Sequence, residues 1–203
     1  MGSGTTIIAQ SYTADEDTLT LSGTEFAVKA LGVDTAEIAD ESVTSDKMSS
    51  GTMYLIERYT ADGLTAEKSF TSLPASAKGF VVRIQGRKTT SGAAGLAITV
   101  NEITSASYDR NEIRVTGSSV TGANGVGTYF DLGLLSATDD TAVIAHIFPF
   151  GDYALMLAKS ATSNDAYEQS GKIDMSGTLT SIQVKVLSAA FTSGSIIELW
   201  GLT

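Results

Sequence analysis

The chain contains no cysteine, only two prolines and a single histidine among its 203 residues. Without cysteine it can form no disulfide and can hold no metal through thiolates, so a folded domain must be stabilised by its core. Two prolines are too few to indicate a disordered, proline-rich chain. Cysteine content alone does not choose between cellular compartments.

Long apolar runs are also absent. No stretch of 18 or more consecutive apolar residues occurs, and such a stretch is what a membrane-spanning helix needs. The first residues, Met-Gly-Ser-Gly-Thr-Thr-Ile-Ile, lack the basic start and long apolar centre of a signal peptide. We therefore expect a soluble protein with no membrane partner and no visible export signal.

Basic residues are scarce, with 13 Lys and Arg against 23 Asp and Glu and a net charge of −10. Binding to a phosphate backbone needs clustered cations, so nucleic acid is not an expected partner. The one small basic cluster, Arg83, Arg87 and Lys88, is expected to face solvent at the end of a strand. Nine of the acids, but only two of the bases, fall within residues 1–51. This asymmetry predicts an acidic arm over 1–51 and a nearly neutral domain over 52–203.

Within the arm, a ten-residue unit occurs twice over residues 32–51. Its apolar residues are spaced five apart, which fits neither a helix nor a half-buried strand. Such a row needs a partner to bury it, and identical copies around a symmetry axis would supply one. A solvated linker is the alternative. The residues predicted to anchor or oligomerise the arm are Val28, Val33, Ile38, Val43 and Met48.

The rest of the chain has the pattern of short strands separated by Gly- and Ser-rich turns, with no sustained helical period. The fold expected is all-β, an antiparallel β-sandwich of the jelly-roll type, preceded by the extended arm. The glycine-rich residues 121–127 are expected to form a turn. The predicted strands cover 52–59, 67–73, 79–87, 96–102, 112–117, 127–134, 141–148, 153–158, 179–187 and 195–202.

The last strand carries large apolar residues on both faces. Ile197, Leu199 and Gly201 alternate with a second set that includes a carboxylate. A carboxylate is satisfied more easily at a partly wet interface than in a dry core. The strand is therefore a candidate subunit interface, although Trp200 could equally be an ordinary residue at the edge of the core. The interface candidates are Ile196, Glu198, Trp200 and Leu202.

The sequence contains few candidates for catalytic residues. The single histidine, His146, lies in an apolar run and is expected to be structural. The adjacent loop acids Asp139 and Asp140 have the composition of a turn. We expect no catalytic, metal-binding or cofactor-binding residues and no cofactor.

The segment Gly-Val-Asp-Thr-Ala-Glu-Ile-Ala-Asp-Glu-Ser-Val-Thr-Ser-Asp-Lys-Met, from residue 32, resembles the connector repeats in structural proteins of tailed bacteriophages. The closing Gly-Ser-Ile-Ile-Glu-Leu-Trp-Gly-Leu is similar to the last strand of their β-domains, with Trp200 where the family usually has Tyr. Tyr108-Asp-Arg-Asn-Glu-Ile and His146-Ile-Phe-Pro-Phe-Gly fit the same order. The arm has two units where long fibres have many, which suits a capsid decoration protein or a short spike.

The resemblance implies a non-enzymatic virion protein that is assembled in the host cytoplasm. Its arm would anchor to the major capsid or tail protein, and its β-domain would form an exposed homotrimeric knob. The alternative is a tail-fibre or receptor-binding module that recognises carbohydrate on the host surface. For that role the candidate contacts are Tyr108, Tyr153 and Tyr167, which lie in or beside predicted loops.

Overall fold

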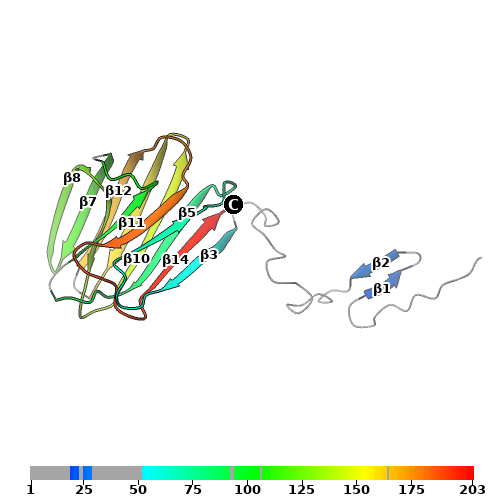
Figure 1. Cartoon of the computed structure of the whole chain (residues 1–203), viewed down its shortest axis with the longest axis horizontal. Coiled ribbons are helices and arrows are strands. Elements are labelled where there is room, and N and C mark those ends of the chain that lie inside the picture. Colours follow the sequence, from blue (N-terminus) through cyan, green and yellow to red (C-terminus); the bar gives the residue numbers. More distant parts are fainter. Residues whose placement is uncertain (1–18, 23–24, 29–51, 92–93, 106, 164) are drawn as a thin grey trace, which may run out of the picture. The chain divides into compact units, whose positions relative to one another are not determined.

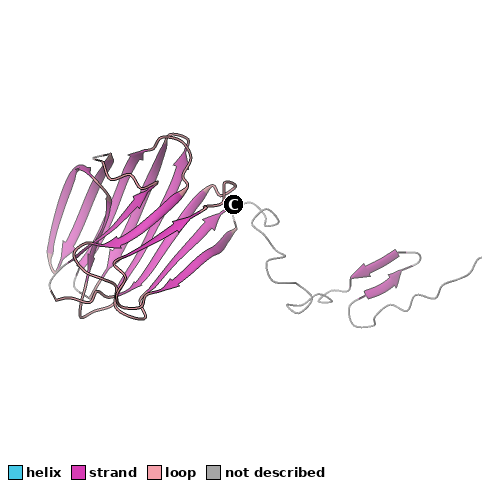
Figure 2. Cartoon of the chain, viewed as in Figure 1, coloured by secondary structure: helices cyan, strands magenta, loops and turns pink. Residues whose placement is uncertain are grey.

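The computed structural model describes residues 19–22, 25–28, 52–91, 94–105, 107–163 and 165–203. The chain divides into two units, Met1–Lys47 and Met48–Thr203. Every regular element in the described ranges is a strand (Figures 1 and 2). Those ranges hold no helix that is long and apolar enough to cross a membrane.

In the N-terminal unit, β1 (Leu19–Ser22) and β2 (Glu25–Val28) form an antiparallel pair, with Leu19 opposite Val28. The sequence predicted only an extended arm over 1–51 and did not anticipate this hairpin. Val28, the first residue of the five-spaced apolar row, is the last residue of β2. The other four members, Val33, Ile38, Val43 and Met48, lie outside the described residues, so the role of the row stays a prediction.

The second unit contains twelve strands among its described residues, and they form two antiparallel sheets. These strands are β3 (Met53–Thr60), β4 (Glu67–Thr71), β5 (Gly79–Gly86), β6 (Ala94–Val100), β7 (Tyr108–Thr116), β8 (Ser119–Gly127), β9 (Phe130–Leu135), β10 (Thr141–Phe150), β11 (Tyr153–Ala161), β12 (Asp165–Asp174), β13 (Ser181–Val186) and β14 (Ile196–Leu202).

The large sheet has the order β3-β14-β5-β10-β11-β12-β7-β8, and the small sheet has the order β4-β13-β6-β9. Five of the pairings are nested along the chain: β7 with β8, β6 with β9, β5 with β10, β4 with β13 and β3 with β14. Successive pairs alternate between the two sheets, which is the jelly-roll arrangement. The hairpin β11–β12 is inserted between β10 and β7. The predicted all-β antiparallel sandwich is confirmed.

Each of the ten predicted strands coincides with an observed one, but β8 and β12 were not predicted. The interpretation of residues 121–127 as a turn is wrong, because they belong to β8. Glycine is unfavourable in strands, so the local sequence preference of this segment is against a strand. The pairing of β8 with β7 over nine residue pairs, from Thr116–Ser119 to Tyr108–Gly127, places the segment in the sheet instead.

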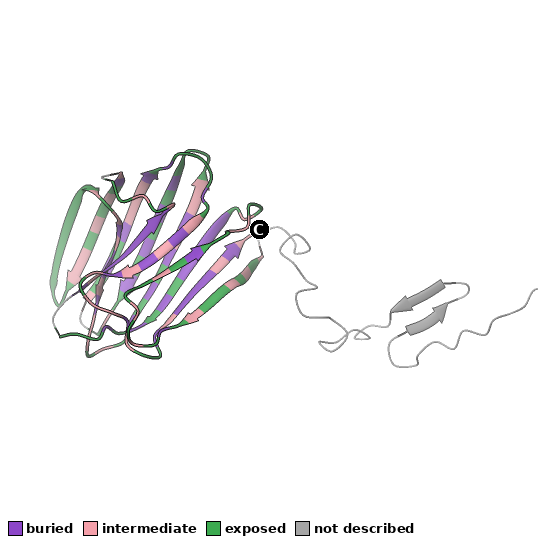
Figure 3. Ribbon diagram, in the orientation of Figure 1, coloured by how far each residue is buried: buried purple, intermediate pink, exposed green. Residues whose placement is uncertain are grey.

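The core lies between the sheets, and in strands such as β10, β11 and β13 it is built by every second residue (Figure 3). In β10, Val143, Ala145 and Ile147 point inward. In β6 of the opposite sheet, Leu96 and Ile98 point inward and are fully buried. In strands with this period of two, one side is buried and the other points outward.

The expected basic cluster at the end of β5 is not uniformly solvent-facing. Arg83 and Arg87 are exposed, but Lys88 is buried and its Nζ donates a hydrogen bond to the carbonyl of Thr90. Lys88 also forms an isolated β-bridge with Phe191. The expectation for Lys88 is wrong, because its side chain is buried and its ammonium group binds a backbone carbonyl instead of solvent.

Candidate functional site

The outward side of the large sheet carries large apolar side chains on five neighbouring strands, β3, β14, β5, β10 and β11. Register places Leu55, Trp200, Val81, His146 and Leu157 in one transverse row across these strands. We call this surface the apolar face. Its members are Met53, Leu55, Val81, Ile144, His146, Phe148, Phe150, Tyr153, Leu155, Leu157, Trp200 and Leu202.

Much of the apolar face is open to solvent. Leu157 is 50% exposed and Phe150 is 51% exposed. Two ring pairs stack on the surface, His146 on Phe148 with centroids 6.1 Å apart and Phe150 on Tyr153 at 5.6 Å. Single exposed apolar residues are common on soluble proteins, but a contiguous apolar patch marks a surface that binds another molecule.

A glycine allows two members of the apolar face to pack over the same position. At Gly79, the first residue of β5, a Cβ atom would lie 3.0 Å from Phe148 and 3.1 Å from Leu202. The two side chains therefore close over a position that has none. This packing connects the β10 part of the apolar face to the β14 part, so the patch is continuous across the strand between them.

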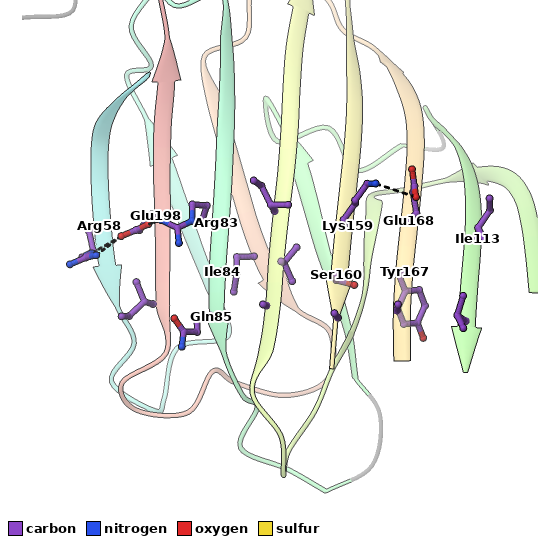
Figure 4. A pocket seen from close by; sticks show the side chains of 17 residues that line it. Arg58, Arg83, Ile84, Gln85, Ile113, Lys159, Ser160, Tyr167, Glu168 and Glu198 are labelled. Carbon is purple, nitrogen blue, oxygen red and sulfur yellow. Dashed lines mark hydrogen bonds and ion pairs between the residues drawn. The ribbon is translucent and has the colours of Figure 1, made fainter. Parts of the chain in front are cut away.

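A buried carboxylate, Glu198, lies at the edge of the apolar face (Figure 4). Its Oε1 accepts a hydrogen bond from Arg58 Nε at 2.8 Å, and its Oε2 accepts bonds from Arg83 Nη1 at 3.0 Å and Trp200 Nε1 at 3.2 Å. Burial by itself raises the pKa of Glu198, but the hydrogen bonds from Arg58 and Trp200 and the two guanidinium charges lower it overall. Glu198 is thus ionised and fixed in place.

Beside Glu198, a groove of about 630 Å³ crosses the same outer side of the sheet. Ala142, Ala161 and Ala166 lie side by side in register and contribute only methyl groups to its lining. The neighbouring transverse row includes Lys159 and Glu168, whose charged atoms are 3.4 Å apart (Figure 4). The groove therefore has an apolar floor with paired charges along one side, a surface suited to the side chains of another protein.

The charges on this side of the large sheet balance, although the whole chain carries −10. Four outward-pointing residues are positive and four are negative, so their sum is zero. An acidic chain repels its own copies, but a neutral surface does not contribute to that repulsion. The charged residues are Arg58, Arg83, Lys159, Lys172, Asp109, Glu168, Asp174 and Glu198.

The structure brings the four interface candidates together. Ile196, Glu198, Trp200 and Leu202 all point outward from β14, while Ile197 and Leu199 are buried in the core. Ile196 and Glu198 line the groove, and Trp200 and Leu202 belong to the apolar face. No partner chain is present to test the contact, so a subunit interface at these residues stays a prediction.

The three tyrosines proposed for glycan contact differ in accessibility. Tyr108 is fully buried, its hydroxyl accepts a hydrogen bond from Val100 N–H at 2.8 Å and donates one to the Ile103 carbonyl at 3.1 Å, and burial raises its pKa to about 12. Tyr108 is therefore wrong as a sugar contact. Only Tyr153, which is 36% exposed, keeps an accessible ring.

Tyr167 is buried between two neighbours. A Cβ at Gly133, where φ is +95°, would lie 2.8 Å from the Tyr167 ring. The guanidinium of Arg114, on β7, lies 5.0 Å from the centroid of the same ring. Burial raises the pKa of Tyr167 to about 12. Both sides of the ring are therefore in contact with the protein, and Tyr167 is also wrong as a stacking platform for a sugar.

Residues considered for catalysis do not form a reactive group in the described part of the chain. His146 lies on the apolar face, where it stacks on Phe148, and not in the core. Asp140 accepts a hydrogen bond from Arg87 Nε at 2.8 Å, which lowers the pKa of its carboxyl group. No cluster of three or more His, Asp or Glu side chains suited to a metal ion occurs among these residues.

The β10 and β11 members of the apolar face were not predicted as site residues. In β11, Tyr153, Leu155 and Leu157 point outward, while the smaller Ala154 and Ala158 point inward. The last strand was identified because both of its sides carry large apolar residues, whereas one side of residues 153–158 carries two alanines beside Met156. Alternation alone would place Leu155 and Leu157 in the core, so the sequence gives no signal that they point outward.

The chain was compared with protein-family models and with curated proteins, and neither comparison finds a match.

Proposed function

We propose that the protein is a non-enzymatic structural component of a virus particle, most consistent with a capsid decoration protein or short spike of a tailed bacteriophage. The observation that carries the proposal is the apolar face on one side of the large sheet, next to the arginine-bound Glu198. A contiguous apolar surface of this kind is typical of a site that binds another protein.

The proposed partner at the apolar face is a further copy of the same chain. The zero net charge of this side of the sheet favours self-association in a chain of net charge −10. Each apolar side chain that becomes fully buried contributes about 1.5–3 kcal/mol. The resulting homo-oligomer is the proposed knob, for which the sequence resemblance implies three copies.

The acidic residues 1–51 are proposed as the segment that anchors the knob to a major capsid or tail protein. The ten-residue repeat and its resemblance to phage connector repeats support this division of roles. Ordering an extended segment costs about 1–2 kcal/mol per residue. Backbone hydrogen bonds to a partner would therefore have to accompany burial of the apolar row.

The test is to locate the protein in purified virions by mass spectrometry and immunogold labelling, with and without residues 1–51. The proposal expects full-length protein on the particle at a fixed copy number. It expects the shortened protein to keep its oligomeric mass but to be lost from the particle. Absence of the full-length protein from virions, or retention of the shortened form, would contradict the proposal.

A second candidate is recognition of host-surface carbohydrate, and one observation favours it. The stacked pair Phe150–Tyr153 is exposed and could receive a sugar ring. Lys172 Nζ lies 5.1 Å from the Tyr153 centroid and pairs with Asp174 Oδ1 at 2.6 Å, so a charged pair borders the two rings. Glycan-array binding by the wild type that disappears in Tyr153→Ala would favour this function, and no binding by the wild type would reject it.

A further inference from the structure

The strand β8 forms one edge of the large sheet (Figure 1) and is exposed almost throughout (Figure 3). Eight of its nine residues are exposed, including Val120 at 68% and Val126 at 58%. Among the described strands it pairs with β7 alone. Its other side therefore presents backbone N–H and C=O groups that the described part of the chain does not satisfy.

Beyond Tyr108, which is part of the core, the inner side of the β7–β8 hairpin is not a core surface either. The inward residues of β7 include Arg110, Glu112 and Arg114, all charged. Arg110 reaches Asp131 of β9 at 3.6 Å, and β9 is the last strand of the small sheet. The small sheet does not extend past β9, so both sides of β8 are open to solvent. A strand without packing on either side is only weakly stable.

The opposite edge of the same sheet carries the protection that β8 lacks. Strand β3 has two charged residues, Glu57 and Arg58, which form ion pairs with Lys68 and Glu198. Its pairing with β14 is interrupted by a register shift between Leu199 and Trp200. Charges and bulges of this kind prevent edge-to-edge association. The sequence of β8, Ser-Val-Thr-Gly-Ala-Asn-Gly-Val-Gly, contains neither a charge nor a proline.

The sequence of β8 is also complementary to itself. If two copies run antiparallel with Ala123 opposite its equivalent, Val120 of each copy faces Val126 of the other. Val120 and Val126 point to the same outer side of the sheet, because they differ by an even number of residues. Two valine pairs would then flank the centre, and β-branched cross-strand pairs stabilise antiparallel sheets.

We propose that β8 pairs antiparallel with β8 of a second copy across a two-fold axis that passes beside Ala123. The two eight-stranded sheets would become one continuous sheet, with both apolar faces on the same side. This contact goes beyond the proposed function. It joins edges and leaves the apolar face free to form the knob.

The test uses the absence of native cysteine in the full-length chain. In Ala123→Cys the two thiols would meet at the axis, with Cβ atoms about 4.5–5.5 Å apart, close enough for a disulfide after a small adjustment. Ser119→Cys, at the end of the same exposed strand, is the matched control. Its two thiols would lie about 26 Å apart in the proposed register, at 3.3 Å per residue over eight residues.

Under mild oxidation, Ala123→Cys is expected to form a disulfide dimer at least about ten-fold faster than Ser119→Cys, because pairing raises the effective concentration of its thiols. Adding Val126→Lys should remove this advantage by placing charges on the edge, while Leu64→Lys at an exposed loop residue should leave it unchanged. Equal rates for the two cysteine variants, or no dimer from Ala123→Cys, would overturn the proposal.

Discussion

The two outer sides of the sandwich have the same backbone pattern but opposite chemistry. On the small sheet, Gln183 Nε2 donates to Ser69 Oγ at 3.1 Å, and Gln183 Oε1 accepts from Thr99 Oγ1 at 3.3 Å. These side chains form a polar row across β4, β13 and β6. On the large sheet, the corresponding positions form the apolar face, where Leu157 is half exposed.

Folding alone does not require this difference. Either outer side could be polar without loss to the core, because the inward residues of both sheets supply the buried cluster. Antiparallel sheets that face water normally show polar residues outside. The polar outer side of the small sheet follows this pattern. The apolar outer side of the large sheet departs from it, as expected of a surface that binds another molecule.

The largest effect is expected from placing a charge on the apolar face. Leu157→Lys should weaken self-association about 100-fold, because its ammonium group would have to be desolvated in the interface. Gln183→Lys adds the same charge to the polar side and should have little effect. The masses of both variants, measured by sedimentation over a range of concentrations, test the contrast.

Equal weakening by Leu157→Lys and Gln183→Lys would show that net charge, and not the apolar face, controls association. Since Leu157 points away from the core, the variant should keep the thermal stability of the isolated subunit. A large loss of stability in Leu157→Lys would instead indicate a folding defect.

The next effect concerns Glu198, which joins the apolar face to the groove. Glu198→Gln should lower the free energy of unfolding by about 1–2 kcal/mol, since charge-assisted hydrogen bonds are lost while both arginines stay largely hydrated. Urea unfolding monitored by the fluorescence of Trp200 measures this change. An unchanged unfolding midpoint would show that the bonds to Arg58 and Arg83 contribute no net stability.

The same variant tests a pH dependence. The folded pKa of Glu198 lies below its ordinary value of 4.5, so its stabilising contribution is complete above pH 4.5 and is lost as the pH falls through the folded pKa. Between about pH 5 and about pH 3, the wild type should therefore lose more stability than Glu198→Gln. Parallel pH profiles would contradict this assignment.

A smaller effect is expected from a substitution in the core, because it changes neither outer side of the sandwich. Tyr108→Phe removes the hydroxyl that bonds Val100 and Ile103, which should cost about 1 kcal/mol of stability without changing the oligomeric mass. Differential scanning calorimetry and light scattering on the same sample separate the two results. A change of mass would mean that core stability and association are coupled.

The smallest effect is expected at the exposed pair of Arg87 and Asp140. Arg87→Gln should leave both the melting temperature and the mass within error, because solvent screens an ion pair between exposed side chains. The experiment is a melting curve at low and at high salt. A clear loss of stability that disappears in high salt would show that this surface pair contributes more than its exposure suggests.

Much of the fold could be predicted because the alternation in strands such as β5 and β13 is local. Ile182, Val184 and Val186 share one side of β13, and burial confirms this period. The edge strand β8 could not be predicted in this way, because Gly122, Gly125 and Gly127 carry no side chains whose pattern would reveal a strand. Its conformation depends on hydrogen bonds to β7, a tertiary effect that overrides local propensity.

The candidate site was predicted only where one strand contained the whole signal. Ile196, Glu198, Trp200 and Leu202 alternate within β14, so their common direction could be derived from the sequence. The arginines that bind Glu198 come from strands distant in the chain, with Arg58 on β3 and Arg83 on β5. Their approach depends on the sheet order, which pattern analysis did not provide.

The most direct test of the proposed assembly is the mass of the full-length protein in solution, measured by light scattering as the protein is diluted. A stable oligomer at the apolar face predicts three times the 21.1 kDa chain mass, and twice that mass where β8 also pairs. A mass of 21.1 kDa at every concentration would contradict self-assembly through this surface.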